Sequence, residues 1–187
     1  MATERRGAML TRQPGSQPAD LAQLYEHDYY TWTGMQAQAL RERKASGLDW
    51  DNLAEEVDDL GKAEVHRLES HLGLLLMHLL KWVYQPQRRS RSWSNSIQEH
   101  RFRIQRVLRS NPGLKAKLPE VFADTYEVVW FSAQNEIGMD MSTFPETCPW
   151  SLDDAMRDDF WPGGSPSAKT PRRTNRADSV RKSGRKF

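Results

Sequence analysis

A long amphipathic helix is the strongest structural signal in this chain. Between residues 49 and 84 apolar side chains recur at helical spacing, and Pro86 marks where the segment must end. On a helical wheel these side chains fall within a sector of about 100°. They are Leu53, Val57, Leu60, Leu68, Leu75, Leu79 and Trp82. At about 1.5 Å per residue the helix is about 50 Å long, so we expect it to be the axis of the domain.

The other long segments also follow the helical period, and none shows sustained period-two alternation, so the pattern predicts an all-α fold. Short connections join the segments, which predicts an antiparallel four-helix bundle-like domain with one long central helix and a short C-terminal helix. Besides the central helix, we expect helices over residues 20–47, 92–111 and 119–138, and a short helix over 151–157.

Composition divides the chain into three parts. Residues 21–162 form the predicted helical domain, whereas residues 1–20 and the basic tail, residues 163–187, are too poor in apolar side chains to fold and are predicted to be disordered. The basic tail carries eight Lys or Arg residues against Asp178 alone, a net charge of +7. Because the whole chain has a net charge of +2, residues 1–162 are left at −5.

The sequence favours a cytoplasmic protein. A single cysteine, Cys148, excludes an internal disulfide and suits a reducing compartment. The N-terminal residues contain no apolar core of a signal peptide. The longest apolar run, residues 72–80, is interrupted by Gly73 and His78 and is shorter than the roughly 20 residues that a bilayer span needs. We therefore expect no membrane partner.

Polar side chains interrupt the apolar stripe of the central helix. Glu64, His71 and His78 lie within it at intervals of seven residues, a carboxylate and imidazoles that zinc, iron or manganese can use. Seven residues span about 10 Å along a helix, which is too far for all three to bind one metal ion. A metal site would need Asp28, His100 or Glu136 from other helices, so we favour a buried polar network and expect no cofactor.

Arg101 is the predicted partner within that network. It lies on the apolar face of its helix beside Ile97, Ile104 and Leu108. A buried charge is costly unless it is paired. We therefore expect Arg101 to pair with Glu64 or Glu56, while His78 and His100 complete a hydrogen-bonded layer.

A basic cluster follows the central helix. It could contact phosphate or a partner, or instead pair within the molecule with helix carbonyls and acidic side chains. The basic tail could likewise adsorb to nucleic acid or serve only solubility. The cluster comprises Lys81, Arg88, Arg89, Arg91 and Trp93.

Several short segments together resemble the bacterial family catalogued as domain of unknown function number twenty-nine. The segments are residues 24–32 (LYEHDYYTW), 53–57 (LAEEV), 76–82 (LMHLLKW), 85–93 (QPQRRSRSW), 144–150 (FPETCPW) and 159–162 (DFWP). The resemblance covers about residues 21–162 and implies an uncharacterised all-helical, soluble bacterial protein, without an established activity. It implies that a shared site would map onto Asp28, Glu55, Glu56, Glu64, His78, Lys81, Arg89, Ser92, Trp93 and Arg101.

No sequence motif identifies a reaction. A glycine-rich phosphate loop, paired metal-binding cysteines, a nucleophile elbow and a dinucleotide fingerprint are all missing. Cys148 would need a histidine beside it in the fold to act as a nucleophile, so packing is the simpler role. We favour a non-enzymatic interaction or regulatory module that binds a protein or nucleic acid. The alternatives are a metal-dependent enzyme that uses carboxylates and histidines in the bundle interior, and an antitoxin-like component of a bacterial two-gene module.

Overall fold

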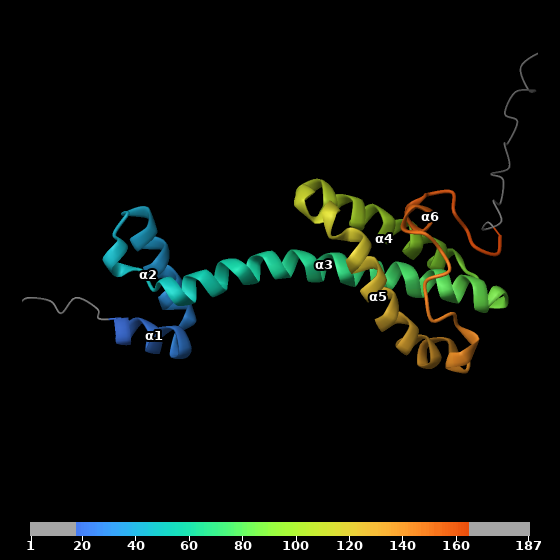
Figure 1. Cartoon of the computed structure of the whole chain (residues 1–187), viewed down its shortest axis with the longest axis horizontal. Helices are drawn as coiled ribbons and strands as arrows, with labels where there is room; N and C mark the ends of the chain where they lie inside the picture. The colour runs from blue at the N-terminus through green and yellow to red at the C-terminus, as the bar shows by residue number, and fades with distance from the viewer. Residues whose placement is uncertain (1–17, 165–187) are drawn as a thin grey trace, which may run out of the picture. The chain divides into compact units, whose positions relative to one another are not determined.

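The computed structural model describes residues 18–164, and this part of the chain contains helices and irregular segments without strands (Figure 1). The all-α prediction is confirmed for these residues. They form two compact units that divide between Glu64 and Val65. The single domain predicted over residues 21–162 stays a prediction, and each unit is described by itself.

The predicted disordered ends are largely outside the description. Residues 1–17 and 165–187 lie outside the described residues, whereas residues 18–20 belong to the first helix. Within the described range, none of the helices has the length and apolar character that a membrane span requires.

The N-terminal unit begins with two helices where one was predicted over residues 20–47. Helix α1 covers Pro18–His27 and helix α2 covers Tyr29–Arg41. Asp28 separates them because its carboxylate accepts a hydrogen bond from the Thr31 backbone nitrogen, 3.0 Å away, and so caps α2. Hydrogen bonding by Thr31, first through its side chain and second through its backbone nitrogen, lowers the pKa of Asp28.

Polar contacts join α2 to the start of the next helix. The Trp32 indole is buried and its Nε1 donates to Asp49 Oδ2 at 3.1 Å. The Asp49 backbone nitrogen donates to the buried Gln36 side chain, Oε1, at 2.8 Å. The short 3-10 helix η1, Ala45–Gly47, makes the turn between the two segments.

Helix α3, Trp50–Tyr84, confirms the predicted long helix and contributes to both units. Its apolar stripe is buried from Leu68 onward, whereas Val57 and Leu60, which the pattern places in the same stripe, are 64% and 71% exposed. Within the N-terminal unit, α1 and α2 bind α3 through Asp49 and Glu56 instead.

The C-terminal unit contains the other predicted helices. The predicted antiparallel four-helix bundle is not confirmed as the arrangement of these helices. After α3 come α4 (Arg91–Ser110), α5 (Leu118–Ala133) and α6 (Leu152–Met156), with the shorter turns η2 (Pro86–Arg88), η3 (Pro112–Ala116), η4 (Gln134–Gly138, a π-turn) and η5 (Met141–Thr143).

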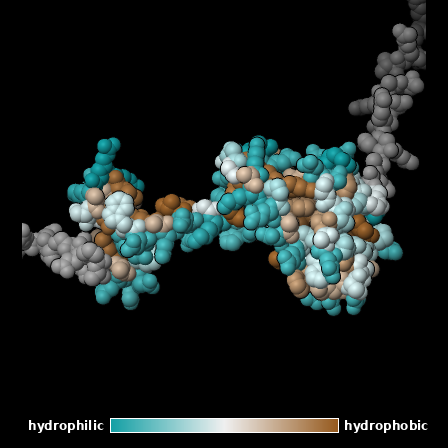
Figure 2. All heavy atoms as spheres, in the orientation of Figure 1, coloured by the Kyte–Doolittle hydropathy of each residue, from teal (hydrophilic) through white to brown (hydrophobic). Residues whose placement is uncertain are grey.

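Helices α3, α4 and α5 build the core of this unit. Figure 1 shows α5 crossing α3, and Gly73 permits close approach there, since a Cβ at this position would lie 3.6 Å from Thr125 Cγ2 and 3.9 Å from Val129 Cγ2. Hydrophilic side chains surround scattered apolar patches on the outer surface (Figure 2). Fully buried side chains include Leu72, Leu76, Ile97, Ile104 and Tyr126.

Arg101 on α4 holds the segment that follows α6. The residue has no exposed surface. Its guanidinium donates to three backbone carbonyl oxygens, at 2.8, 3.2 and 2.7 Å. The acceptors belong to Ala155, Asp158 and Phe160. The predicted pairing with Glu56 or Glu64 is therefore wrong, because the end of α6 presents carbonyl oxygens that satisfy the buried charge.

Contacts between aromatic rings and arginine side chains also hold this segment. Trp161 lies 5.0 Å from Trp82 between ring centroids, and the Arg101 guanidinium lies 5.5 Å from the Trp161 ring. Arg89 covers the Trp82 ring at 5.1 Å. The chain then turns at Gly163, whose φ of 73° favours glycine. Two cations and two indoles thus anchor residues 158–164 to α3 and α4.

Arg101→Met tests this anchor. The substitution removes the donors of three carbonyl oxygens, so we expect the free energy of unfolding to fall by about 3–5 kcal/mol. Urea unfolding followed by tryptophan fluorescence measures the change. Arg103→Met, on the same helix but exposed and paired with Glu99, is the control and should cost less than about 0.5 kcal/mol. Equal midpoints for the two variants would contradict the anchoring role.

Candidate functional site

The residues predicted as one polar site are divided between the two units. Asp28 and Glu56 belong to the N-terminal unit, and Glu64 is its last residue. His71, His78, His100 and Arg101 belong to the C-terminal unit. A binding role for either group stays a prediction.

Glu56 is a structural acceptor in the N-terminal unit. Its two carboxylate oxygens accept hydrogen bonds from the hydroxyls of Tyr25 and Tyr29, at 2.8 and 2.6 Å. The bond to Glu56 is the largest cause that raises the pKa of Tyr25 to about 12. Both tyrosine rings also pack against Trp32, at centroid distances of 4.9 and 5.8 Å. Glu56 therefore ties α1 and α2 to α3.

The three predicted histidines form a row between α3 and α4. His100 lies 5.5 Å from His71 and 6.4 Å from His78 between ring centroids. His78 Nδ1 lies 2.8 Å from the Leu74 carbonyl oxygen, whereas the Nδ1 atoms of His71 and His100 are buried without a hydrogen-bond partner. The predicted hydrogen-bonded layer with Arg101 is thus replaced by a packed row of rings.

Burial is the main cause of the lowered pKa values of His71 and His100. It lowers the pKa of His71, and Arg103 and Arg67 lower it further. Burial also lowers the pKa of His100, with a second contribution from His71. Within residues 18–164, no group of three or more His, Cys, Asp or Glu side chains is placed to hold a metal ion.

The predicted basic cluster is partly used inside the molecule. Lys81 pairs with Glu136 at 2.7 Å. The Arg89 Nε donates to the Trp82 carbonyl oxygen at 2.8 Å, and Trp93 packs against the core. Arg88 and Arg91 remain exposed, and contact between this cluster and phosphate stays a prediction.

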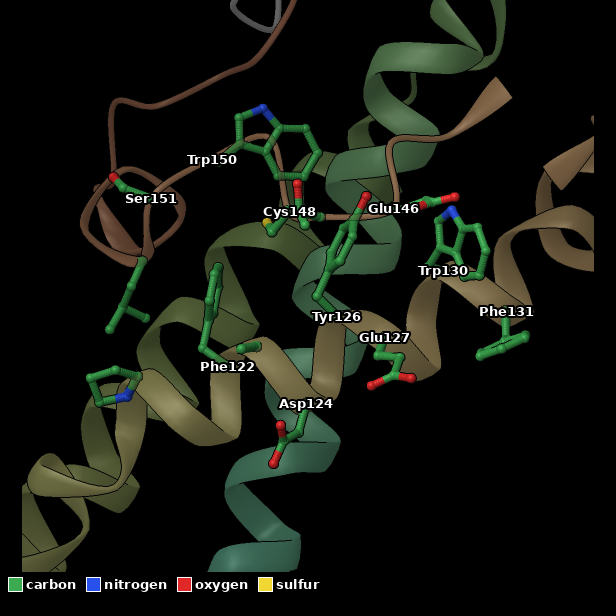
Figure 3. Close-up of a pocket in the computed structure, with 14 residues that line it drawn as sticks. Phe122, Asp124, Tyr126, Glu127, Trp130, Phe131, Glu146, Cys148, Trp150 and Ser151 are labelled. Carbon is green, nitrogen blue, oxygen red and sulfur yellow. The ribbon is translucent and has the colours of Figure 1, made fainter. Parts of the chain in front are cut away.

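A further concave site lies between α5 and residues 146–152. This aromatic groove has a volume of about 760 Å³. In Figure 3, Phe122 and Tyr126 rise from α5 toward Trp150 and Cys148 on the opposite wall, and Trp130 and Phe131 lie at one end. Its lining residues are Pro119, Phe122, Ala123, Asp124, Tyr126, Glu127, Trp130, Phe131, Glu146, Thr147, Cys148, Trp150, Ser151 and Leu152.

Two hydrogen bonds position the wall opposite α5. The Tyr126 hydroxyl donates to the Pro145 carbonyl oxygen at 2.7 Å, and Trp130 Nε1 donates to the Phe144 carbonyl oxygen at 3.2 Å. Phe144 itself is buried and packs edge-on against Tyr84 of α3. At the other end of the wall, Ser151 caps α6 by accepting from the Asp154 nitrogen at 3.0 Å. Both walls are therefore fixed by the fold.

The groove is negatively charged. Its lining includes the exposed carboxylates of Asp124, Glu127 and Glu146, and none of the described residues that line it is Lys, Arg or His. Burial raises the pKa of the Cys148 thiol. None of the described residues that line the groove is a histidine, so no imidazole on its walls is placed to deprotonate this thiol. The chemistry that the walls offer is aromatic contact and attraction of cations.

Sequence reasoning did not identify this groove. For α5 the pattern predicts only a helix over residues 119–138, and residues 144–150 (FPETCPW) enter only through the family resemblance. The proline and aromatic residues concentrated in residues 144–150 could have indicated the groove. Proline restrains irregular segments, and large rings leave concave surfaces between them.

Acidification tests the histidine row. Because the folded-state pKa values of His71 and His100 are lowered, their contribution to stability is complete above the unfolded value of about 6.5 and is lost as the pH falls below it. We expect the free energy of unfolding to decrease from pH 7.5 to 5.0, and to decrease less in His71→Gln/His100→Gln. Urea unfolding at each pH measures this, with His27→Gln on exposed α1 as the control. Parallel curves for the chain and the double variant would contradict it.

Comparison with known proteins identifies the family. The family model described as Domain of unknown function DUF29 matches residues 24–161. No curated protein and no solved structure matches the chain significantly. The matched range contains α2 to α5, the groove and the Arg101 anchor. With well over half of its residues matched, this chain belongs to the DUF29 family.

Proposed function

We propose that this chain is a non-enzymatic interaction module whose aromatic groove binds a basic segment of a protein partner. The observation that carries the proposal is the combination of aromatic walls with three carboxylates and no opposing basic side chain in one groove. Ligand sites are commonly concave, largely apolar and provided with a few polar groups that select the ligand.

The aromatic side chains supply the contact area. Trp130 uses its indole nitrogen within the fold, so its half-buried ring, with the half-buried ring of Trp150 and the exposed ring of Phe131, is left to meet a ligand. Lysine and arginine bind such faces through cation–π contacts, worth about 0.5–1 kcal/mol at exposed sites. The aliphatic stems of these side chains also cover apolar surface.

The carboxylates select the charge of the ligand. Asp124 and Glu127 extend from α5 on the side away from Trp150, and Glu146 lies beside Trp130, so these carboxylates stand at the rim of the groove and attract a cation that enters it (Figure 3). The same charges repel phosphate, which makes nucleic acid an unfavourable ligand for this groove. Nucleic acid binding through the basic tail, or through Arg88 and Arg91, is a separate prediction.

Peptide titration tests the proposal. Three synthetic peptides of equal length and matched apolar content, one basic, one neutral and one acidic, are titrated into the protein by calorimetry. We expect the basic peptide to bind most tightly. Neutralising the groove with Asp124→Asn/Glu127→Gln/Glu146→Gln should weaken its affinity about tenfold, because attraction by three nearby carboxylates is lost.

A matched variant separates the groove from the net charge. Asp51→Asn/Glu55→Gln/Asp58→Asn changes the net charge equally on exposed positions of the N-terminal unit, and it should leave the affinity within about twofold because these side chains do not line the groove and exposed charges are screened by salt. Phe131→Ala tests the aromatic contribution at a 58% exposed position on the groove. Equal affinities for all three peptides, or equal effects of the two charge variants, would refute the proposed site.

A further inference from the structure

We propose that the basic tail of this chain is itself an occupant of the aromatic groove, so that a partner binds by displacing residues 165–187. This inference rests on the proposed function, because it assigns a regulator to the same groove. It concerns how the groove is controlled rather than what it binds.

Charge complementarity is the first observation. The groove carries three carboxylates, and the basic tail carries eight cationic side chains against Asp178. The cations are Lys169, Arg172, Arg173, Arg176, Arg181, Lys182, Arg185 and Lys186. The chain therefore contains the class of ligand that the groove is proposed to select.

Chain length is the second observation. Leu152 lines the groove and Gly164 is the last described residue, so the path between them is at most about 40 Å when fully extended. The 23 residues from 165 to 187 can span up to about 75 Å. The cations in the second half of this segment can therefore return to the groove.

The starting point of the tail is also fixed. The Trp82 Nε1 donates to the Gly164 carbonyl oxygen at 3.0 Å, and Arg89 packs over the Trp82 ring. The tail is thus tethered to the unit that holds the groove. When a ligand is joined to its own site by a short linker, its effective concentration at that site can reach the millimolar range, so even weak contacts can keep the groove occupied.

The thiol of Cys148 reports occupancy, because it lines the groove and is the one cysteine of the sequence. Its alkylation by iodoacetamide, an uncharged reagent, is measured by mass spectrometry for the full chain and for a full-length variant in which the eight tail cations are replaced by Ser. We expect Cys148 of the variant to react about fivefold faster, which is the ratio expected if the tail of the full chain occupies the groove about 80% of the time. Helix content from circular dichroism checks that both proteins are folded.

A second variant assigns the protection to the groove. Asp124→Asn/Glu127→Gln/Glu146→Gln is combined with each form of the tail, and the measured quantity is the ratio of alkylation rates between the two tails. The ratio should fall from about five to near one when the carboxylates are removed, because coupled sites give non-additive effects. Using the ratio cancels any direct effect of the carboxylates on thiol reactivity. A ratio unaffected by these substitutions overturns the inference.

Addition of the basic peptide distinguishes this inference from the proposed function. One outcome is that the peptide slows alkylation of Cys148 in the variant with the Ser-substituted tail, while Cys148 reacts equally fast with either tail when no peptide is present. The groove then binds basic peptides and the inference is wrong. If the tail protects Cys148 while the peptide has no effect in the variant with the Ser-substituted tail, binding of basic segments from a partner is wrong. Protection by both supports the competition.

Discussion

The buried guanidinium of Arg101 is the interaction on which the C-terminal unit depends. Removing this charge from water is costly, and burial lowers its pKa. Three carbonyl oxygens and the Trp161 ring replace the lost hydration. The planar fork of arginine can serve three acceptors at fixed directions, which an ammonium on a flexible stem cannot do. One side chain of α4 consequently holds the carbonyl groups of Ala155, Asp158 and Phe160 in place.

This anchor also determines the groove. Residues 146–152 form one wall, and they are held on one side by Tyr126 and Trp130 and followed on the other by α6. Arg101 binds the carbonyl oxygen of Ala155 within α6 and those of two residues beyond it. The wall therefore lies between two fixed attachments, and a preformed wall costs little ordering entropy when a ligand binds. Stability and the shape of the site thus have a common origin.

The helices could be predicted from local information, whereas their polar partners could not. Periodicity and Pro86 were sufficient for α3, because both act within a few residues. The break at Asp28 was missed because one aspartate fits either a helical face or a cap. Arg101 was recognised as a buried charge, but its acceptors are backbone atoms more than fifty residues away and backbone carbonyls carry no sequence signature. The groove was missed for the same reason, since its walls meet only in the folded unit.

The distribution of charge gives the groove a further physical meaning. Outside the basic tail the chain is net acidic, and the tail reverses the sign of the whole. A partner that competes with a tethered cationic segment gains only the difference between its own contacts and those it displaces. Electrostatic attraction to the groove favours both the partner and the tail that it displaces, so this contribution partly cancels. Shape and aromatic contact with Trp130, Phe131 and Trp150 would then decide which basic segment succeeds, so the tail would convert a groove that attracts cations in general into one that discriminates among them.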